Sequence, residues 1–133
     1  MPREINIERR AALLRGLDHF CATDDYYKTL MASVVYTDGV RYMAKEGCAY
    51  WLIDAVVSHQ QAAWKNERLA DFQVWQLKVN DDGSAVLSCH EDLPGPELIR
   101  QEIDHTDFPL DTIKLYVARQ DVNQWVIMLP SEY

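Results

Sequence analysis

Long apolar runs are missing from this sequence of 133 residues. A membrane-spanning helix needs about 18–20 consecutive apolar residues, whereas the longest candidate, residues 49–57, is nine residues long and contains Asp54. The first residues also lack the charged segment followed by an apolar segment that marks a secretory signal peptide. We therefore expect a soluble, cytoplasmic protein that does not bind membranes.

Cysteine and glycine are scarce, and each scarcity excludes a class of protein. The three cysteines are widely spaced and form no Cys-x-x-Cys pair, so we expect reduced thiols rather than a disulfide framework. The five glycines are too scattered to build a phosphate-binding loop. Neither a Gly-x-Ser-x-Gly nor a His-Glu-x-x-His motif is present. The sequence therefore carries no enzyme signature and predicts no cofactor.

Basic residues are outnumbered, with 13 Lys and Arg against 21 Asp and Glu and a net charge of -8. This balance argues against direct binding of nucleic acid through its phosphates. What is present is an ordinary globular composition, 48% hydrophobic and 26% charged. The length is typical of one domain. We therefore expect residues 1–133 to form a single domain.

The first half of the chain, residues 1–66, is expected to be helical. Apolar residues recur near the helical period in its first segment, where Asn6 is a suitable N-cap. Residues 34–36 are β-formers and favour an extended conformation. Helices are predicted over residues 6–17, 23–27, 40–46 and 49–64.

The second half, residues 67–133, changes to the alternating period of strands. A hairpin turn is predicted at residues 80–83, where Gly83 can adopt positive φ. A helix starting near Pro109 is the alternative to the fourth strand. We predict an α+β fold in which N-terminal helices pack on a C-terminal antiparallel meander of about five strands. The strands are predicted near residues 74–79, 84–89, 99–104, 113–117 and 125–129.

The negative charge belongs entirely to the second half. Residues 1–66 hold eight basic and eight acidic residues, whereas residues 67–133 hold five and thirteen. One interpretation is that these carboxylates keep the sheet soluble and prevent edge pairing. The other is an acidic face that docks on a basic protein partner. The candidate residues for that face are Glu91, Asp92, Glu97, Glu102, Asp104, Asp107 and Asp111.

Metal binding and cysteine chemistry are the first chemical hypotheses. The close Cys/His pairs are His19 with Cys21 and Cys89 with His90. Neither has the usual spacing of a zinc site, so the two pairs would have to meet in space. Cys48 is predicted at the start of a helix, where its thiolate would be favoured. A small buried residue between two helices is the simpler interpretation, and we predict no metal.

A pocket between the helices and the sheet is the second chemical hypothesis. Asp54 lies in sequence among Tyr50, Trp51 and apolar neighbours, and a buried carboxyl there could act as an acid or base. The polar residues on the same stripe of the helix instead indicate that Asp54 faces solvent or caps a neighbouring turn. Residues 104–111 hold three aspartates that could bind a hard cation, but they lack the glycine and the alternation of a calcium loop.

Aromatic residues are a further source of candidate contacts, because exposed Tyr and Trp mark interfaces. Most of the four tryptophans and seven tyrosines are expected in the core. Tyr26, Tyr27 and Trp64 lie in the most polar sequence surroundings, so they are the better candidates for an interface.

Several segments resemble a family of small uncharacterised bacterial proteins that also occur on phages and plasmids. They are Tyr-Thr-Asp-Gly-Val at 36–40, Ala-Tyr-Trp-Leu-Ile-Asp-Ala at 49–55 and the ending Met-Leu-Pro-Ser-Glu-Tyr at 128–133. Residues 72–75 and 106–111 extend the resemblance over nearly the whole chain from about Phe20. The resemblance implies one compact unit and a possible origin on mobile elements. It implies no catalytic residue.

Two hypotheses on function follow. The first is a non-catalytic interaction protein whose acidic sheet half binds a basic partner, such as a host nucleic-acid-processing or defence complex that it inhibits in an anti-CRISPR-like manner. The second is a small enzyme or ligand-binding domain that uses Cys48, Tyr50, Trp51 and Asp54 in a pocket between the helices and the sheet.

Overall fold

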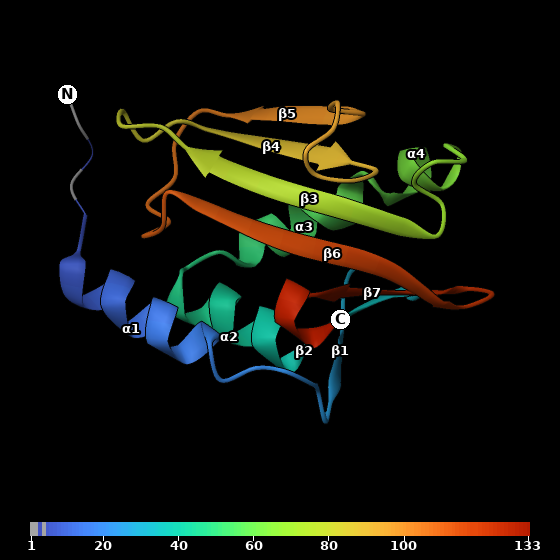
Figure 1. Ribbon diagram of the computed structural model, residues 1–133, viewed down its shortest axis with the longest axis horizontal. Coiled ribbons are helices and arrows are strands. Elements are labelled where there is room, and N and C mark those ends of the chain that lie inside the picture. The colour runs from blue at the N-terminus through green and yellow to red at the C-terminus, as the bar shows by residue number, and fades with distance from the viewer. Residues whose placement is uncertain (1–2, 4) are drawn as a thin grey trace.

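The computed structural model describes Arg3 and residues 5–133. Within these residues the chain is a mixed α+β structure with four α-helices, one 3-10 helix and a seven-stranded sheet (Figure 1). The helices are α1 (Ile7–Leu17), α2 (Asp38–Glu46), α3 (Tyr50–Ser58) and α4 (Gln60–Trp64), with η1 at Pro130–Glu132. The strands are β1 (Tyr26–Lys28), β2 (Val34–Thr37), β3 (Phe72–Val79), β4 (Ala85–His90), β5 (Ile99–Ile103), β6 (Thr112–Asp121) and β7 (Gln124–Met128).

The strand order is β1-β2-β7-β6-β3-β4-β5. β2 pairs with β7 in parallel, and the other neighbouring pairs are antiparallel. The prediction of about five strands in a meander was therefore wrong in number and in order. β6 pairs with β3 rather than with β5. The residues predicted as a helix at 23–27 include most of β1, so that prediction was wrong. The extended conformation predicted at residues 34–36 is confirmed by β2.

The helical predictions agree with the structure at two places and differ from it at a third. Asn6 caps α1, where its side chain accepts a hydrogen bond of 3.0 Å from the Arg9 N–H. α2 ends at Gly47, the predicted interruption. The pattern over 49–64 was predicted as one helix, but it forms two, α3 and α4, which are separated by His59.

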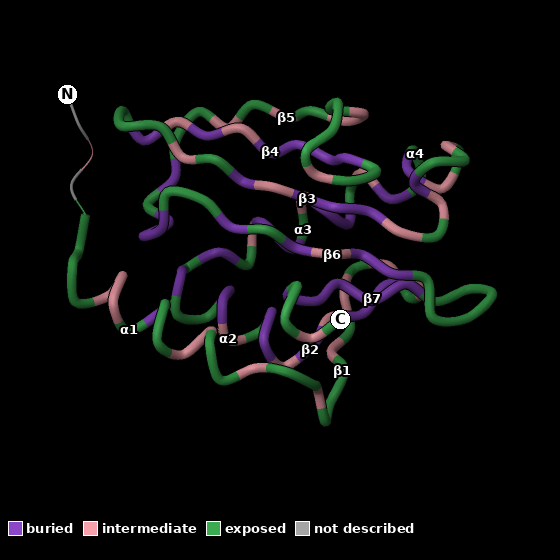
Figure 2. The backbone as a smooth tube through the Cα atoms, in the orientation of Figure 1, coloured by how far each residue is buried: buried purple, intermediate pink, exposed green. Residues whose placement is uncertain are grey.

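One face of the sheet forms the core. Odd-numbered residues of β3, β4 and β6 face the helices, and Trp75, Leu77, Leu87 and Leu115 are almost completely buried there. They form one apolar cluster with helical residues such as Met43 and Leu52. Figure 2 shows buried backbone along these strands and the inner turns of the helices. Burial of this area supplies the main driving force for folding.

A buried polar network joins α4 to β3. The Gln60 and Gln73 side chains exchange two amide hydrogen bonds of 2.9 Å, and both residues are 0% exposed. The indole N–H of Trp75 donates to the Gln73 Oε1 at 2.7 Å. The remaining Gln60 donor bonds the Val56 carbonyl. Because a buried amide without partners is costly, this network fixes the position of α4 over the sheet.

The C-terminal segment binds the start of α2. The Glu132 carboxylate accepts hydrogen bonds from the Thr37 hydroxyl at 2.6 Å and from the Gly39 N–H at 3.2 Å. A negative charge at this helix end is favourable because the helix dipole is positive there. A Cβ at Gly39 would lie 2.6 Å from the Glu132 Oε1, so glycine permits the close approach. The quoted segments 36–40 and 128–133 are thus joined in the fold.

Candidate functional site

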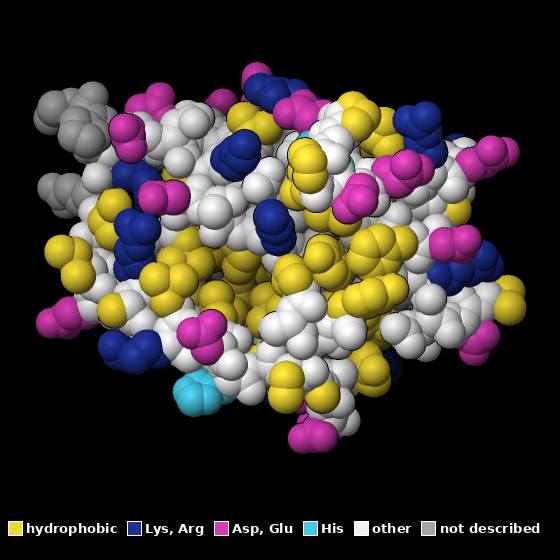
Figure 3. Space-filling model, viewed as in Figure 1, with side chains coloured by type: hydrophobic (Ala, Val, Ile, Leu, Met, Phe, Trp, Pro, Cys, Tyr) yellow, Lys and Arg dark blue, Asp and Glu magenta, His cyan; other side chains and the backbone are white. Residues whose placement is uncertain are grey.

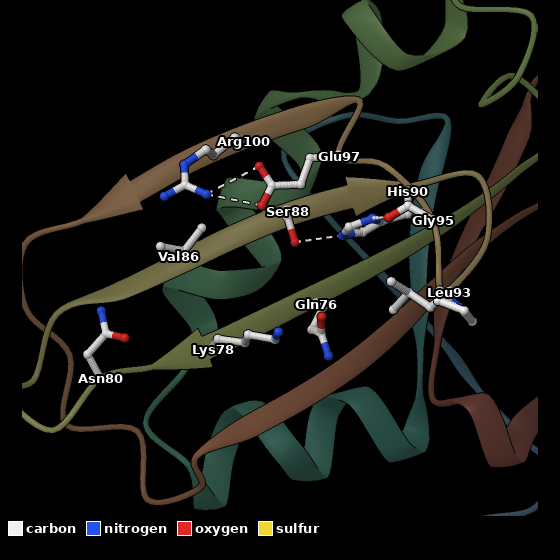
Figure 4. A pocket seen from close by; sticks show the side chains of 11 residues that line it. Gln76, Lys78, Asn80, Val86, Ser88, His90, Leu93, Gly95, Glu97 and Arg100 are labelled. Atoms are coloured by element: carbon white, nitrogen blue, oxygen red, sulfur yellow. Dashed lines mark hydrogen bonds and ion pairs between the residues drawn. The ribbon is translucent and has the colours of Figure 1, made fainter.

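The side of the sheet opposite the core carries an open groove. Even-numbered residues of β3 and β4 point to this side, and no α-helix of the described residues covers this part of the sheet (Figure 1). A groove of about 440 Å³ runs over β3, β4 and β5 (Figure 4). It is lined by Gln76, Lys78, Asn80, Val86, Ser88, His90, Leu93, Pro94, Gly95, Glu97 and Arg100.

His90 builds one wall of this groove. Its Nε2 lies 2.8 Å from the Ser88 hydroxyl, and its Nδ1 lies 3.0 Å and 3.1 Å from the carbonyl oxygens of Gly95 and Pro96. The His90 side chain is buried, and Figure 4 shows it beneath the loop that contains Gly95. Both ring nitrogens therefore have partners, and the ring ties the loop between β4 and β5 to the sheet.

A second hollow of about 330 Å³ continues the groove along β5. It shares Asn80, Val86 and Arg100 with the first hollow, and it extends to Glu102 and Asp104. The two hollows therefore form one path from the β4–β5 loop to the opposite end of the sheet.

Basic and acidic side chains alternate in the middle of the groove. The Arg100 guanidinium lies 3.0 Å from a Glu97 carboxylate oxygen and 3.5 Å from one of Glu102. The hydrogen bond to Glu97 raises the pKa of Arg100. Lys78 is exposed and has no ion-pair partner among the described residues. In Figure 3, acidic and basic side chains are interspersed over the face shown.

The seven candidate carboxylates do not form one cluster. Glu91 and Asp92 are exposed in the β4–β5 loop, at one end of the sheet. Asp104 and Asp107 are exposed in the connection between β5 and β6, at the other end. Asp111 lies 2.7 Å from Arg3 and 3.2 Å from Arg10, and the hydrogen bond from Arg3 holds its pKa below the usual value. The remaining two, Glu97 and Glu102, are the partners of Arg100.

Two further acids, Asp81 and Asp82, lie at the same end of the sheet as Asp104 and Asp107. The Thr106 N–H donates to the Gly83 carbonyl at 2.8 Å, so the β3–β4 hairpin lies beside the β5–β6 connection. Gly83 has a φ of +89°, which suits glycine and confirms the predicted turn. Asp81 and Asp82 were not among the candidates predicted from the sequence. The sequence did contain a signal for this arrangement. In a run of antiparallel strands β3, β4 and β5, the β3–β4 hairpin and the connection that follows β5 lie at the same end of the sheet.

The groove therefore lies between two acidic loops. β4 has six residues, so the hairpin and the β4–β5 loop are separated by about 17–20 Å. The Asp82 carboxylate accepts hydrogen bonds from the Ser84 hydroxyl and N–H, which lower its pKa. The other acids in this arrangement, Asp81, Glu91, Asp104 and Asp107, make no side-chain hydrogen bond or ion pair within the described residues.

The cysteine and zinc candidates lie in separate places. Among the described residues, no group of three or more His, Cys, Asp and Glu side chains could hold a metal ion, so the pairs His19/Cys21 and Cys89/His90 do not meet. Burial raises the pKa of the Cys89 thiol to about 12, which disfavours its thiolate. Cys48 is exposed and has a φ of +51°, so its interpretation as a buried residue between helices was wrong.

The predicted pocket between helix and sheet exists only in part. Tyr50 and Asp54 from α3 line a hollow of about 270 Å³ together with Tyr36 and residues 28–30. Asp54 itself is exposed. Cys48 and Trp51 do not line this hollow, and Trp51 packs against the core instead.

The three candidate interface aromatics differ in their surroundings. Tyr26 is 56% exposed on the edge strand β1. The Tyr27 hydroxyl donates to the Asp38 carboxylate at 2.8 Å, and the Arg41 guanidinium lies 4.6 Å from the centre of its ring. Trp64 stacks on Trp125 with ring centroids 4.2 Å apart. Trp64 therefore takes part in packing, while Tyr26 is the most accessible of the three.

Comparison with known proteins places this chain in a family. The profile of a family of unknown function, DUF6876, matches residues 11–133. The chain belongs to this family. The match covers every helix and strand except the first turn of α1. The comparisons with curated proteins and with solved structures found no match. No helix in the described part of this DUF6876 protein is long and apolar enough to cross a membrane.

Proposed function

We propose that this DUF6876 protein is a non-catalytic interaction protein that binds a basic segment of a partner protein along the uncovered face of its sheet. The observation that carries the proposal is the groove over β3, β4 and β5, with exposed acidic loops at both ends. The partner segment would carry basic residues at two points about 17–20 Å apart. Between these points it would carry neutral or acidic groups that fit beside Lys78 and Arg100.

Electrostatics support this choice of partner. Exposed carboxylates without partners raise the local concentration of positive surfaces and speed association. The groove adds contact area, because Val86 and Leu93 supply apolar surface and Ser88 and Gln76 supply hydrogen-bonding groups. An alternating pattern of acidic, basic and acidic groups also rejects segments with the wrong charge order.

The proposal extends to the class of partner. Proteins that bind nucleic acid present basic segments to phosphates, and the two acidic loops can bind such a segment in place of the phosphates. We therefore propose an inhibitor, encoded on a bacterial mobile element, of a host nucleic-acid-processing or defence complex. Such an anti-CRISPR-like protein would act in the cytoplasm and would not bind nucleic acid itself.

Charge reversal at both ends of the groove tests the proposal. The probe is a fluorescent peptide with two Lys-Arg pairs separated by about five neutral residues, which span about 17 Å when extended. The test variant is Asp81→Lys/Glu91→Lys, which changes one acid in each loop. The control variant is Asp18→Lys/Glu67→Lys, which changes two exposed acids elsewhere by the same total charge. Fluorescence anisotropy gives the Kd of each protein.

The peptide is expected to bind the wild-type protein and the control variant with the same Kd. The test variant is expected to bind at least about tenfold more weakly, because two attractive contacts become repulsive. Raising the salt concentration should weaken wild-type binding as well. Equal affinity for the test and control variants, or no binding to the wild-type protein, would contradict the proposal.

A second candidate function is favoured by the hollow beside α3. Tyr36, Tyr50 and Asp54 present two phenols and a carboxylate to a space of about 270 Å³, which suits a small polar molecule. We propose this hollow as the site of the alternative ligand-binding or enzymatic function. A thermal-shift screen of metabolites against the wild-type protein and Tyr50→Phe/Asp54→Asn tests it. A compound that raises the Tm of only the wild-type protein would support this site. A screen that finds no such compound would contradict the proposed ligand-binding function.

A further inference from the structure

Strand β5 forms one edge of the sheet, and β4 is its only hydrogen-bonded neighbour within the described residues. It lies along the upper edge of the molecule in Figure 1. A free edge exposes backbone N–H and C=O groups that can pair with another strand. The chemistry of β5 determines which strand that edge accepts.

The backbone groups of Arg100 and Glu102 point away from β4. The Asn80 N–H donates to the Ser84 carbonyl at 2.7 Å, so even-numbered residues of β4 bond to β3 and odd-numbered ones bond to β5. The partners of the odd-numbered residues are Ile99, Gln101 and Ile103. Since bonding direction alternates along a strand, the N–H and C=O groups of Arg100 and Glu102 face the open edge.

The side chains of β5 are complementary to a reversed copy of the same strand. The strand reads Ile-Arg-Gln-Glu-Ile, with Gln101 at its centre. In an antiparallel pair with Gln101 opposite its own copy, each Arg100 lies opposite a Glu102 and each Ile99 lies opposite an Ile103. Opposite charges placed across two strands stabilise the pair, whereas like charges would repel.

We propose that two copies of this chain associate through β5 to form one continuous antiparallel sheet with a two-fold axis at Gln101. The backbone geometry agrees with this register. Arg100 and Glu102 form the two hydrogen-bonded pairs, and Gln101 forms the non-hydrogen-bonded pair between them, which is the alternation that an antiparallel ladder requires. The dimer contains two cross-strand ion pairs and four new backbone hydrogen bonds.

The opposite edge of the sheet does not offer the same match. β1 has three residues, Tyr26–Lys28, and the same arrangement there contains no pair of opposite charges. The other end of the sheet therefore lacks the self-complementarity of β5. Pairing through β5 also places the two grooves side by side, because Arg100 and Glu102 line them. The dimer is independent of whether the groove binds a basic partner.

Two single charge reversals and their mixture test the dimer. Arg100→Glu leaves acids at both positions 100 and 102, and Glu102→Arg leaves two bases, so each variant repels its own copy. Mixed together, the two variants place opposite charges at both contacts. Lys45→Glu and Glu67→Arg are the controls, because they change the charge equally at exposed positions away from β5. Sedimentation velocity over about 10–500 µM protein covers the affinity range expected of a small interface.

The wild-type protein and both controls are expected to dimerise as the concentration rises. Each reversal alone is expected to remain a monomer, and the equimolar mixture is expected to form a heterodimer. A wild-type protein that stays monomeric at the highest concentration would overturn the proposal, as would self-association of either reversal like that of the wild type. A mixture that remains monomeric would also overturn it.

A measurement without any substitution guards against variants that fail to fold. Amide hydrogen exchange of the wild-type protein is expected to slow at Arg100 and Glu102 as the concentration rises, because these amides become hydrogen-bonded in the dimer. Exchange in β1 should not change. Exchange rates at Arg100 and Glu102 that are independent of concentration would contradict pairing through β5.

Discussion

The two faces of the sheet differ in burial and chemistry, although both are formed by alternate residues of the same strands. One face packs against the helices, and the other forms the groove. On β4, Leu87 faces the helices and is 1% exposed, while its neighbour Val86 lines the groove. On β3, Gln73 is buried in an amide network, while Gln76 faces the groove. The larger apolar cluster lies on the covered face. The uncovered face can therefore hold polar and charged groups at little cost to folding.

The largest difference between the faces is expected from truncation of apolar residues. Leu87→Ala should lower the free energy of unfolding by about 2–5 kcal/mol, because it leaves a cavity in the core. Val86→Ala should cost about 1 kcal/mol or less, because the side chain borders an open groove. Urea denaturation of both variants measures the two values. Equal losses would contradict the division between the faces.

The buried amides on the covered face allow a second contrast. Gln73→Leu should cost about 2–3 kcal/mol, because it leaves the Gln60 amide and the Trp75 N–H without their partner. Gln76→Leu makes the same chemical change three residues along the strand, and it should alter stability by about 0.5 kcal/mol or less. Thermal unfolding followed by circular dichroism gives both changes. A stable Gln73→Leu variant would show that the network contributes little.

The uncovered face also contains a region of packed aromatic side chains beside the open groove. Away from the groove, Tyr133 contacts Phe72 and Tyr116, with ring centroids 5.1 and 5.8 Å apart. Val126 and Met128 form a small buried cluster on the same side. Tyr133→Ala should cost about 1 kcal/mol through the lost ring contacts, and Tyr26→Ala, at an exposed edge, about 0.5 kcal/mol or less. Chemical denaturation distinguishes the two, and a larger loss for Tyr26→Ala would reverse this order.

The smallest expected effect is a pH dependence at Asp38, outside both faces. Hydrogen bonds from Tyr27 and from the Asp24 and Asp25 backbone hold the pKa of the Asp38 carboxyl below its ordinary value. Its stabilising contribution is therefore complete above about pH 5, and it is lost as the pH falls through the lowered pKa. Asp38→Asn should reduce the loss of stability between neutral pH and about pH 3. An unchanged pH profile in that variant would mean that Asp38 does not contribute.

Local features of the fold could be predicted from the sequence, because they depend on neighbouring residues. The cap at Asn6, the hairpin at Gly83 and the alternation along β3 are patterns of a few residues. β1 was mistaken for a helix because two acids precede Tyr26 and resemble the first turn of a helix. A strand of three residues is also too short to show an alternating pattern.

Long-range pairing could not be predicted in this way. The parallel alignment of Val34 with Trp125 joins residues 91 positions apart, and no local pattern encodes it. The bond between Thr37 and Glu132 depends on the same alignment. Periodicity indicated which residues face the same side of each strand, but strand order decides which residues become neighbours.

The candidate site was predicted in composition but not in arrangement. The excess of acids in the second half was clear from the sequence. Their division between two ends depends on strand direction, and the neutralisation of Asp111 by Arg3 and Arg10 depends on a contact over about 100 positions. The groove requires the loop that His90 holds over the sheet, and no short motif signals that contact.

The most direct measurement of the central claim is a map of where a basic segment binds. Titration of isotope-labelled protein with the Lys-Arg peptide, followed by amide chemical shifts, reports the position of the contact residue by residue. We expect the largest shifts at Gln76, Lys78, Val86 and Ser88 and in the acidic loops around Asp81 and Glu91. Shifts confined to the helices, or spread evenly over all exposed acids, would contradict it.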